Sequence, residues 1–246
     1  MEPLIIAGPC AVESKEQIEK IASGVSKLGI KFLRGGAFKP RTLPDSFQGL
    51  GAIGINFLTE SAKKYSLKSV SEVMDTEDLE LFREVDVIQI GSRNMFNYSL
   101  LKKVAARYPK KPVLLKRGFS AKINEVIGAL KYLKKYGHNS DVFVCERGIR
   151  TFSDSLRFTF DVGFIAEMKR RFGNKIFILA DPSHAAGRKD LVFPLALSGI
   201  CAGADGLIIE VRLESEPICD AQQAINLKEL ERLIVASKKV FLDSRI

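Results

Sequence analysis

The sequence lacks the features that mark membrane-spanning, secreted and zinc-ribbon proteins. No apolar run in its 246 residues approaches the ~20 residues of a membrane span. The first residues carry no basic segment and no long apolar stretch of the secretory kind. The four cysteines, Cys10, Cys145, Cys201 and Cys219, are widely spaced and form no CxxC pair, which argues against a zinc ribbon or a thioredoxin-like site. We therefore expect no membrane association, a cytoplasmic location and reduced thiols.

Clustered basic residues are also missing, although the net charge is +9. Proteins that bind nucleic acids usually gather Lys and Arg on one patch, often with aromatic residues between them. Here the basic residues are dispersed, and short runs such as Lys169-Arg170-Arg171 fall on helical patterns as solvated faces. We expect no nucleic-acid partner, and the charge fits a cleft that collects anionic substrates.

Short apolar segments rich in β-branched residues recur along the whole chain and alternate with segments of helical periodicity. Buried strands are predicted at residues 4–7, 32–33, 69–73, 85–90, 113–115, 142–145, 176–180 and 207–211. Helical periodicity is clear at residues 16–28, 123–133 and 227–241. This alternation indicates a parallel α/β protein. Eight units in about 250 residues favour a single (β/α)8 TIM barrel. A doubly wound sheet is the alternative, but no strand is followed by a GxGxxG fingerprint.

Ionisable side chains follow the carboxyl ends of these predicted strands, where barrel enzymes have their active sites. Two long stretches without periodicity, residues 35–54 and 213–221, are predicted as loops at this end. Six cations gather there: Arg34, Lys39, Arg41, Arg93, Lys116 and Arg147. Such a ring repels itself unless anions bind, and Arg matches phosphate and carboxylate oxygens. Two phosphates and a carboxylate would carry about −5, at roughly −2 per phosphate. Alternatively, some of these cations pair with Glu72, Asp75 and Glu146.

A second set at the same end combines a thiol, an imidazole and two carboxylates. Its members are Cys10, His184, Glu210 and Asp220, which follow the first, seventh and eighth predicted strands. The last and first strands become neighbours when a barrel closes, so these side chains could converge. The mixed donors suit Mn, Fe, Co or Zn better than Mg or Ca. Without a metal, Cys10 is a small buried hydrophobe and the others are a core histidine and capping carboxylates. The second histidine, His138, is expected at the surface.

Seven motifs occur in a fixed order along the chain: AGPC (7–10), RGGAFKPRT (34–42), SFQG (46–49), IGSRN (90–94), CERGIRTF (145–152), DPSH (181–184) and GADG (203–206). Together they resemble 3-deoxy-D-arabino-heptulosonate 7-phosphate (DAHP) synthase, in the microbial subfamily related to 3-deoxy-octulosonate 8-phosphate (KDO8P) synthase. The resemblance runs from Leu4 to about Leu230. It implies a (β/α)8 barrel that condenses phosphoenolpyruvate with erythrose 4-phosphate, the first step of the shikimate pathway. It also implies a divalent metal ion and a homo-oligomer, either a dimer or a tetramer.

The resemblance further implies roles for individual residues at matching motif positions. Cys10, His184, Glu210 and Asp220 match the metal ligands. Arg34 and Lys39 match the partners of the phosphoenolpyruvate carboxylate, whereas Arg93, Lys116 and Arg147 match its phosphate cradle. Arg41 and Thr42 match the aldose phosphate site, and Ser92 and Asp181 are expected to line the substrate site. Cys10 and His184 count among the catalytic residues, with Lys39 and Glu146 as candidates for activating water or moving a proton.

The chain departs from the family pattern in its last loop. Arg212-Leu213 replaces the usual His-Pro, and Cys219-Asp220-Ala221 replaces Ser-Asp-Gly. Because the first strand begins at residue 4, we expect one catalytic domain over residues 1–246. We expect no fused regulatory domain, and hence weak or no direct feedback inhibition by aromatic amino acids.

Two alternative functions follow from the same residues. KDO8P synthase uses arabinose 5-phosphate and carries a loop resembling Lys-Ala-Asn-Arg-Ser-Ser, whereas this chain has KPRT at 39–42, which favours the four-carbon aldose. A catalytically inactive barrel that serves as a binding module is the other alternative. The retention of all four ligand types and all six cations argues against it.

Overall fold

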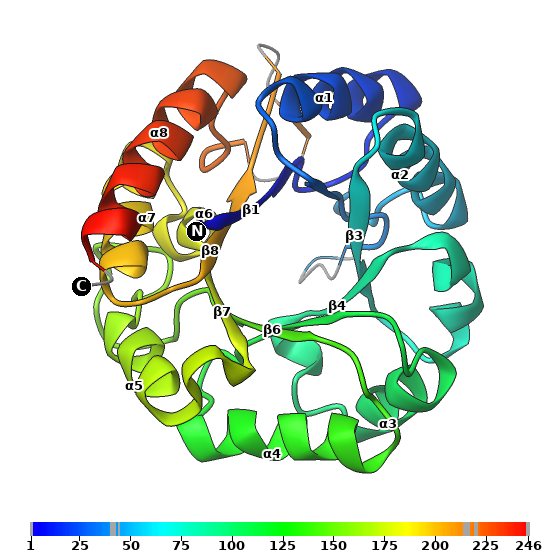
Figure 1. Ribbon diagram of the computed structural model, residues 1–246. Helices are drawn as coiled ribbons and strands as arrows, with labels where there is room; N and C mark the ends of the chain where they lie inside the picture. The colour runs from blue at the N-terminus through cyan, green and yellow to red at the C-terminus, as the bar shows by residue number, and fades with distance from the viewer. Residues whose placement is uncertain (1, 40–42, 44, 214–216, 219–220, 245–246) are drawn as a thin grey trace.

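Eight parallel strands close into a barrel surrounded by helices (Figure 1). This computed structural model describes residues 2–39, 43, 45–213, 217–218 and 221–244. The strands are β1 (Leu4–Gly8), β2 (Phe32–Arg34), β3 (Lys68–Val73), β4 (Val87–Ile90), β5 (Val113–Lys116), β6 (Val142–Glu146), β7 (Phe177–Ala180) and β8 (Gly206–Glu210). They follow one another in sequence order around the barrel, and β8 pairs with β1. The predicted (β/α)8 barrel is confirmed.

The connections between strands carry the helices that form the outer layer of the barrel. The α-helices are α1 (Lys15–Lys27), α2 (Ala52–Lys64), α3 (Tyr98–Arg107), α4 (Ile123–Lys135), α5 (Val162–Phe172), α6 (Pro182–Ala186), α7 (Val192–Cys201) and α8 (Leu227–Asp243). Short 3₁₀ turns are η1 (Glu77–Glu84), η2 (Ser92–Asn94), η3 (Gly173–Lys175) and η4 (Lys189–Leu191). The loop predicted over residues 35–54 ends earlier, because α2 begins at Ala52.

The strands separate two apolar layers. A large core lies between strands and helices. A smaller cluster lines the inside of the barrel, with Phe32 of β2 packed against it; its members, from the other seven strands, are Ile6, Val70, Val87, Leu114, Phe143, Cys145, Leu179 and Ile208. Side chains alternate between the two faces of a strand, so the residue two positions further along each strand shares this inner face. Those residues are Arg34, Glu72, Gln89, Lys116, Cys145, Asp181 and Glu210. A polar layer therefore covers the apolar interior at the carboxyl ends of the strands.

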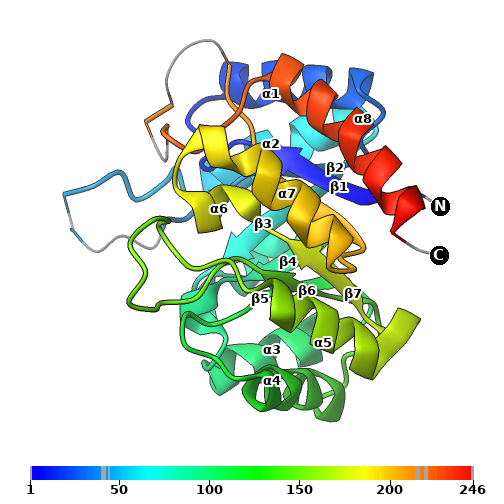
Figure 2. The same ribbon diagram turned by 90° about the vertical axis from the view of Figure 1, so that its left-hand side faces the viewer.

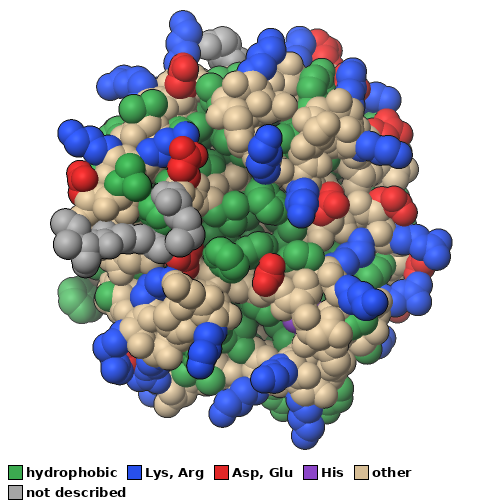
Figure 3. Space-filling view, in the orientation of Figure 1, with side chains coloured by type: hydrophobic (Ala, Val, Ile, Leu, Met, Phe, Trp, Pro, Cys, Tyr) green, Lys and Arg blue, Asp and Glu red, His purple; other side chains and the backbone are tan. Residues whose placement is uncertain are grey.

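The two ends of the barrel differ in character. Figure 2 shows the loops after β2 and β6 projecting at one end, while both chain termini lie at the other. Figure 3 views the end that carries the termini: apolar side chains gather at its centre, and Lys and Arg are spread around its rim. The dispersed basic residues on this face agree with the charge pattern of the sequence.

His138 follows α4 and is buried, with 7% of its surface exposed. The expectation of a surface position is wrong. The His138 backbone N–H donates to the carbonyl of Leu133, and its ring Nε2 lies 3.0 Å from the carbonyl oxygen of Lys111. The turn after α4 therefore folds the ring under the helix, where a carbonyl accepts its N–H. A local turn motif does not reveal that contact, because its acceptor lies 27 residues away.

The burial of His138 predicts a loss of stability in acid. Burial lowers the pKa of His138 from its usual 6.5, opposed by the Lys111 carbonyl and Asp141. Below about pH 6.5 the unfolded chain therefore binds a proton that the folded chain takes up less readily, and the free energy of unfolding falls. His138→Gln keeps a donor for Lys111 but does not titrate. Urea denaturation at about pH 8, 6.5 and 5 should show a shallower decline in the variant. Parallel declines in both proteins would contradict this prediction.

Candidate active site

The polar layer comes together because β1 and β2 approach closely at their carboxyl ends. A side chain at Gly8 would place its Cβ 2.0 Å from the carbonyl oxygen of Arg34. Beyond the strands, the Gly36 N–H donates to the Cys10 carbonyl at 3.2 Å, and Ala11 bridges Gly36. This turn aims Cys10 across the top of the barrel toward β8, where Gly8 is in register with Glu210.

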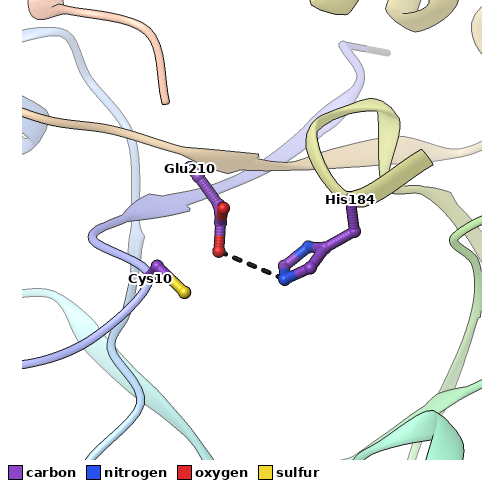
Figure 4. A group of neighbouring side chains, drawn as sticks. All are labelled: Cys10, His184 and Glu210. Atoms are coloured by element: carbon purple, nitrogen blue, oxygen red, sulfur yellow. Dashed lines mark ion pairs between the residues drawn. The ribbon is translucent and has the colours of Figure 1, made fainter. Parts of the chain in front are cut away.

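Cys10, His184 and Glu210 point toward one another at the top of the barrel (Figure 4). One donor atom from each lies within 4.8 Å of the others, and His184 Nε2 lies 3.2 Å from Glu210 Oε1. His184 sits in the first turn of α6, where Asp181 caps the helix by accepting from the His184 backbone N–H. Pro182 at the first helical position fixes that start. The DPSH motif thus presents an imidazole to the thiol and the carboxylate.

The charges around these three side chains fit a bound cation. Asp181 Oδ2 lies 2.8 Å from His184 Nδ1, which places a carboxylate beside the ring. Burial lowers the pKa of His184 and so favours neutral imidazole, although Asp181 and Glu210 oppose this effect. Burial raises the pKa of Glu210, but His184, Arg34 and Lys39 together hold it well below its usual value. His184 Nε2 and Glu210 Oε1 lie 3.2 Å apart, so both side chains can turn a donor atom toward one shared ion.

Lys39 completes this corner of the site. Its Nζ lies 2.8 Å from Cys10 Sγ and 3.2 Å from the Cys10 carbonyl oxygen. An ammonium so close favours the thiolate, the form that binds metals. Asp220, the fourth predicted ligand, and Arg41 and Thr42 lie outside the described residues.

Two of the six predicted cations are held in buried ion pairs. Arg34 Nη1 lies 2.6 Å from Glu210 Oε1, and Lys116 Nζ lies 2.7 Å from Asp181 Oδ2. These carboxylates belong to the site and differ from those considered as partners from the sequence. Glu72 instead accepts from Gln89 at 2.8 Å. Arg34 therefore stands beside Glu210 and Lys116 beside Asp181, each with further N–H groups for a substrate.

Arg147 is a buried cation that is packed against aromatic rings. It is 5% exposed, and its Nη1 has no hydrogen-bond partner among the described residues. Its guanidinium lies over the rings of Phe119 and Phe158, at 4.8 and 4.2 Å from their centroids. Burial lowers the pKa of Arg147. Such a cation is held by packing, and its free donor is suited to an incoming anion.

Ser92 and Arg93 extend the same region from β4. The Ser92 hydroxyl is buried and has no partner among the residues that the structure describes. Arg93 is exposed and lies over Phe119, with 5.5 Å between its Cζ and the ring centroid. Arg93 and Arg147 thus lie over the same ring, that of Phe119.

Glu146 lies apart from this cluster. Its Oε2 accepts from Arg117 at 2.9 Å, and its Oε1 accepts from the backbone N–H of Gly148 at 2.7 Å. It is fully buried on the face of β6 opposite Cys145. Burial raises the pKa of Glu146, and Arg117 opposes this. These contacts give Glu146 a structural role.

Sequence reasoning missed Gln223, whose side chain reaches the site. Gln223 is 2% exposed, and its Nε2 donates to Glu210 Oε2 at 2.5 Å. It lies in an irregular turn that carries no strand or helix pattern. The loop that precedes it returns to the barrel through the pairing of Val211 with Ile225. No pattern in the sequence indicates that pairing.

A barrel that joins a Cys/His/Glu donor set to buried cations at the carboxyl ends of its strands has the site of a metal-assisted enzyme for anionic substrates. The chain belongs to the DAHP synthetase I family, whose profile matches residues 1–243. The resemblance seen in the seven motifs is confirmed. Within the described residues, no helix is long and apolar enough to cross a membrane.

Known relatives support this assignment. The chain is 44% identical over 238 residues to phospho-2-dehydro-3-deoxyheptonate aldolase of Thermotoga maritima, covering 96% of this chain and 69% of that one. The crystal structure of that DAHP synthase superposes with a TM-score of 0.90 at 41% identity, over 97% of this chain and 69% of that one. A truncated form gives 0.87 at 39% identity, over 97% and 86%. A 2-dehydro-3-deoxyphosphooctonate aldolase of Fusobacterium nucleatum is 26% identical over 251 residues, 94% of this chain and 87% of that one.

Proposed function

We propose that this protein is an enzyme that condenses phosphoenolpyruvate with erythrose 4-phosphate and water to give DAHP and phosphate, the first step of the shikimate pathway. The observation that carries this function is the 44% identity to the Thermotoga maritima enzyme over 96% of the chain. The convergence of Cys10, His184 and Glu210 supports it, because Cys10 and His184 come from motifs that define the resemblance and Glu210 ends the last strand.

Cys10, His184 and Glu210, with Asp220 as the fourth ligand, are proposed to hold a divalent Mn, Fe, Co or Zn ion. The donor set of thiolate, imidazole and carboxylate fits these ions. The chemistry that such an ion supplies is polarisation of the aldehyde oxygen, which makes the carbonyl carbon a better electrophile. Asp181 positions His184 by capping its helix, and Lys39 favours the Cys10 thiolate.

The cations bind and align two substrates that are both anionic. Arg147, Arg93, Lys116 and Ser92 are proposed to hold the phosphate of phosphoenolpyruvate. Arg34 and Lys39 are proposed to hold its carboxylate. Arg41 and Thr42 are proposed for the aldose phosphate. The free Nη1 of Arg147 is the clearest support, because an unpaired buried donor is stabilised by an anion. Holding two charged substrates end to end supplies most of the catalysis through positioning and charge neutralisation.

The bond changes set the remaining demands on the site. C3 of phosphoenolpyruvate attacks the aldehyde carbon and positive charge develops at C2. Water then adds at C2, and phosphate leaves with cleavage of its C–O bond. Lys39 is proposed as the group that moves a proton, since its ammonium lies at the edge of the donor cluster. Glu146 is not proposed for this role, because both of its oxygens are engaged on the other face of β6.

The choice of aldose gives a direct test. We expect the rate of phosphate release from phosphoenolpyruvate to be at least about tenfold higher with erythrose 4-phosphate than with arabinose 5-phosphate. The longer aldose separates its aldehyde from its phosphate by one more carbon, so it cannot place both at fixed subsites. EDTA should stop release and Mn²⁺ should restore it. Preference for arabinose 5-phosphate would make the protein a KDO8P synthase, and no release with any metal would make it a binding barrel.

We propose a homo-oligomer, either a dimer or a tetramer, in the cytoplasm. Light scattering on the purified protein tests the first statement, since a mass of 27.3 kDa corresponds to one chain.

A further inference from the structure

The carboxylate of Glu210 is held on each oxygen by a different part of the chain. Oε1 faces Arg34 Nη1 at 2.6 Å and His184 Nε2 at 3.2 Å. Oε2 accepts from Gln223 Nε2 at 2.5 Å. Only Oε1 therefore faces the space shared with Cys10 and His184.

The amide of Gln223 can adopt only one orientation in this network. Its Oε1 lies 3.0 Å from Arg157 Nη1. A guanidinium has no acceptor, so the amide oxygen must face Arg157 and the NH₂ group must face Glu210. Arg157 thus fixes which end of the amide meets the carboxylate.

The backbone places Gln223 at this point. Beyond β8, Val211 pairs with Ile225, and the Ile225 N–H donates to the Glu210 carbonyl at 3.0 Å. The Lys189 N–H donates to the carbonyl of Gln222 at 2.8 Å, which ties the same turn to η4. Gln223 is therefore held beside Glu210 by contacts that do not involve its own side chain.

We propose that Gln223 is a positioning residue for the metal site: it holds Oε2 of Glu210 so that this carboxylate presents Oε1 alone to the ion. This inference rests on the metal-dependent function proposed above. A residue that hydrogen-bonds the non-coordinating atom of a metal-ligating side chain typically changes metal affinity by about 10- to 100-fold. Without the amide donor, the carboxylate can rotate and present both oxygens, or turn to Arg34 alone.

Gln223→Met tests this inference, because methionine has a similar length but no donor. Gln222→Met, in the same turn but on an exposed side chain, is the matched control. Metal-free proteins are titrated with Co²⁺, and binding is read from the thiolate-to-cobalt absorption. We expect binding about 10- to 100-fold weaker in Gln223→Met with a changed ligand-field spectrum, and wild-type values in the control. Gln223→Glu should also bind weakly, because a carboxylate has no hydrogen to donate to Glu210.

The Co²⁺ readout does not depend on turnover, so two failures can be told apart. Thiolate-bound Co²⁺ in the wild type, with the same affinity and spectrum in Gln223→Met, would overturn the role of Gln223 and leave the proposed function standing. Absence of thiolate-bound Co²⁺ in the wild type would overturn both the metal site and this inference. Thermal unfolding of the metal-free variants reports packing separately. A lower melting temperature with unchanged Co²⁺ binding would make Gln223 a purely structural residue.

Discussion

Cys10→Ser should lower metal-dependent phosphate release by more than about 100-fold while the barrel stays folded. The soft thiolate is the donor that distinguishes this site from an ordinary carboxylate–histidine pair. A serine hydroxyl keeps its proton near neutral pH and is a poor ligand for Mn, Fe, Co or Zn. The variant should therefore purify with less metal and need more added Mn²⁺ to reach half of its own maximal rate.

The fold of Cys10→Ser should survive because the local structure depends on the backbone of residue 10. Its carbonyl accepts from Gly36 N–H and from Lys39 Nζ, and both contacts remain. The side chain packs against Ala11 and Phe47 in a small cluster. Burying a hydroxyl there costs about 1–3 kcal/mol. Unfolding of the metal-free proteins measures this cost.

Two other cysteines serve as controls for that experiment. Cys201→Ser lies on an exposed position at the end of α7 and should change neither metal content nor rate. Cys145→Ser buries a hydroxyl in the barrel interior, so it should lower stability and leave metal content intact. Wild-type metal content and rate in Cys10→Ser would return Cys10 to the role of a small buried hydrophobe.

The fold could be predicted because parallel barrel strands are buried on both faces and appear as continuous apolar runs. Several strands end one residue later than predicted, because the strand hydrogen bonding continues through a charged residue. Arg34, Lys116 and Glu146 each end a strand that the apolar pattern stops before. Burial of a charge inside a strand depends on its partner, and the partner comes from another strand.

The site was only partly predictable because continuous apolar runs hide which alternate residues face inward. Barrel closure brings the ends of β1 and β8 together, and the predicted convergence of Cys10, His184 and Glu210 is observed. For β6, Cys145 belongs to the inner cluster, so Glu146 must face the helices. The sequence alone contains no signal that selects this alternation over the opposite one. Gln223 depends in addition on a loop contact that no periodicity encodes.

The alternation of side chains between the two faces of a strand gives different roles to two arginines, Arg117 after β5 and Arg147 after β6. Arg117 lies outside the barrel, where its Nη1 contacts Glu146 at 2.9 Å and Asp161 at 2.8 Å, and its Nε donates to the Ala121 carbonyl. Arg147 continues the inner face and contacts aromatic rings. Both are buried. Replacing each by methionine should therefore separate stability from substrate binding.

Arg117→Met should lower the free energy of unfolding by about 3–5 kcal/mol, because it leaves Glu146 buried without its cation. The loss should shrink as pH falls, since a protonated Glu146 carries no charge to bury. Adding Glu146→Gln to Arg117→Met should recover part of the loss. Where the double variant folds, its KM for phosphoenolpyruvate should remain within a few-fold of the wild type.

Arg147→Met should raise the KM for phosphoenolpyruvate by about 10- to 100-fold, corresponding to about 1.5–3 kcal/mol for a hydrogen bond to a charged group. Its free energy of unfolding should stay equal or rise, because no ion pair among the described residues is lost and a guanidinium is no longer buried. Urea denaturation and steady-state phosphate release on the same preparations measure both quantities. A large loss of stability in Arg147→Met with an unchanged KM would assign Arg147 to the structure of the barrel and remove it from the phosphate site. Comparing the variants at residues 117 and 147 therefore tests whether the inner face of the strands binds the substrate and the outer face only stabilises the fold.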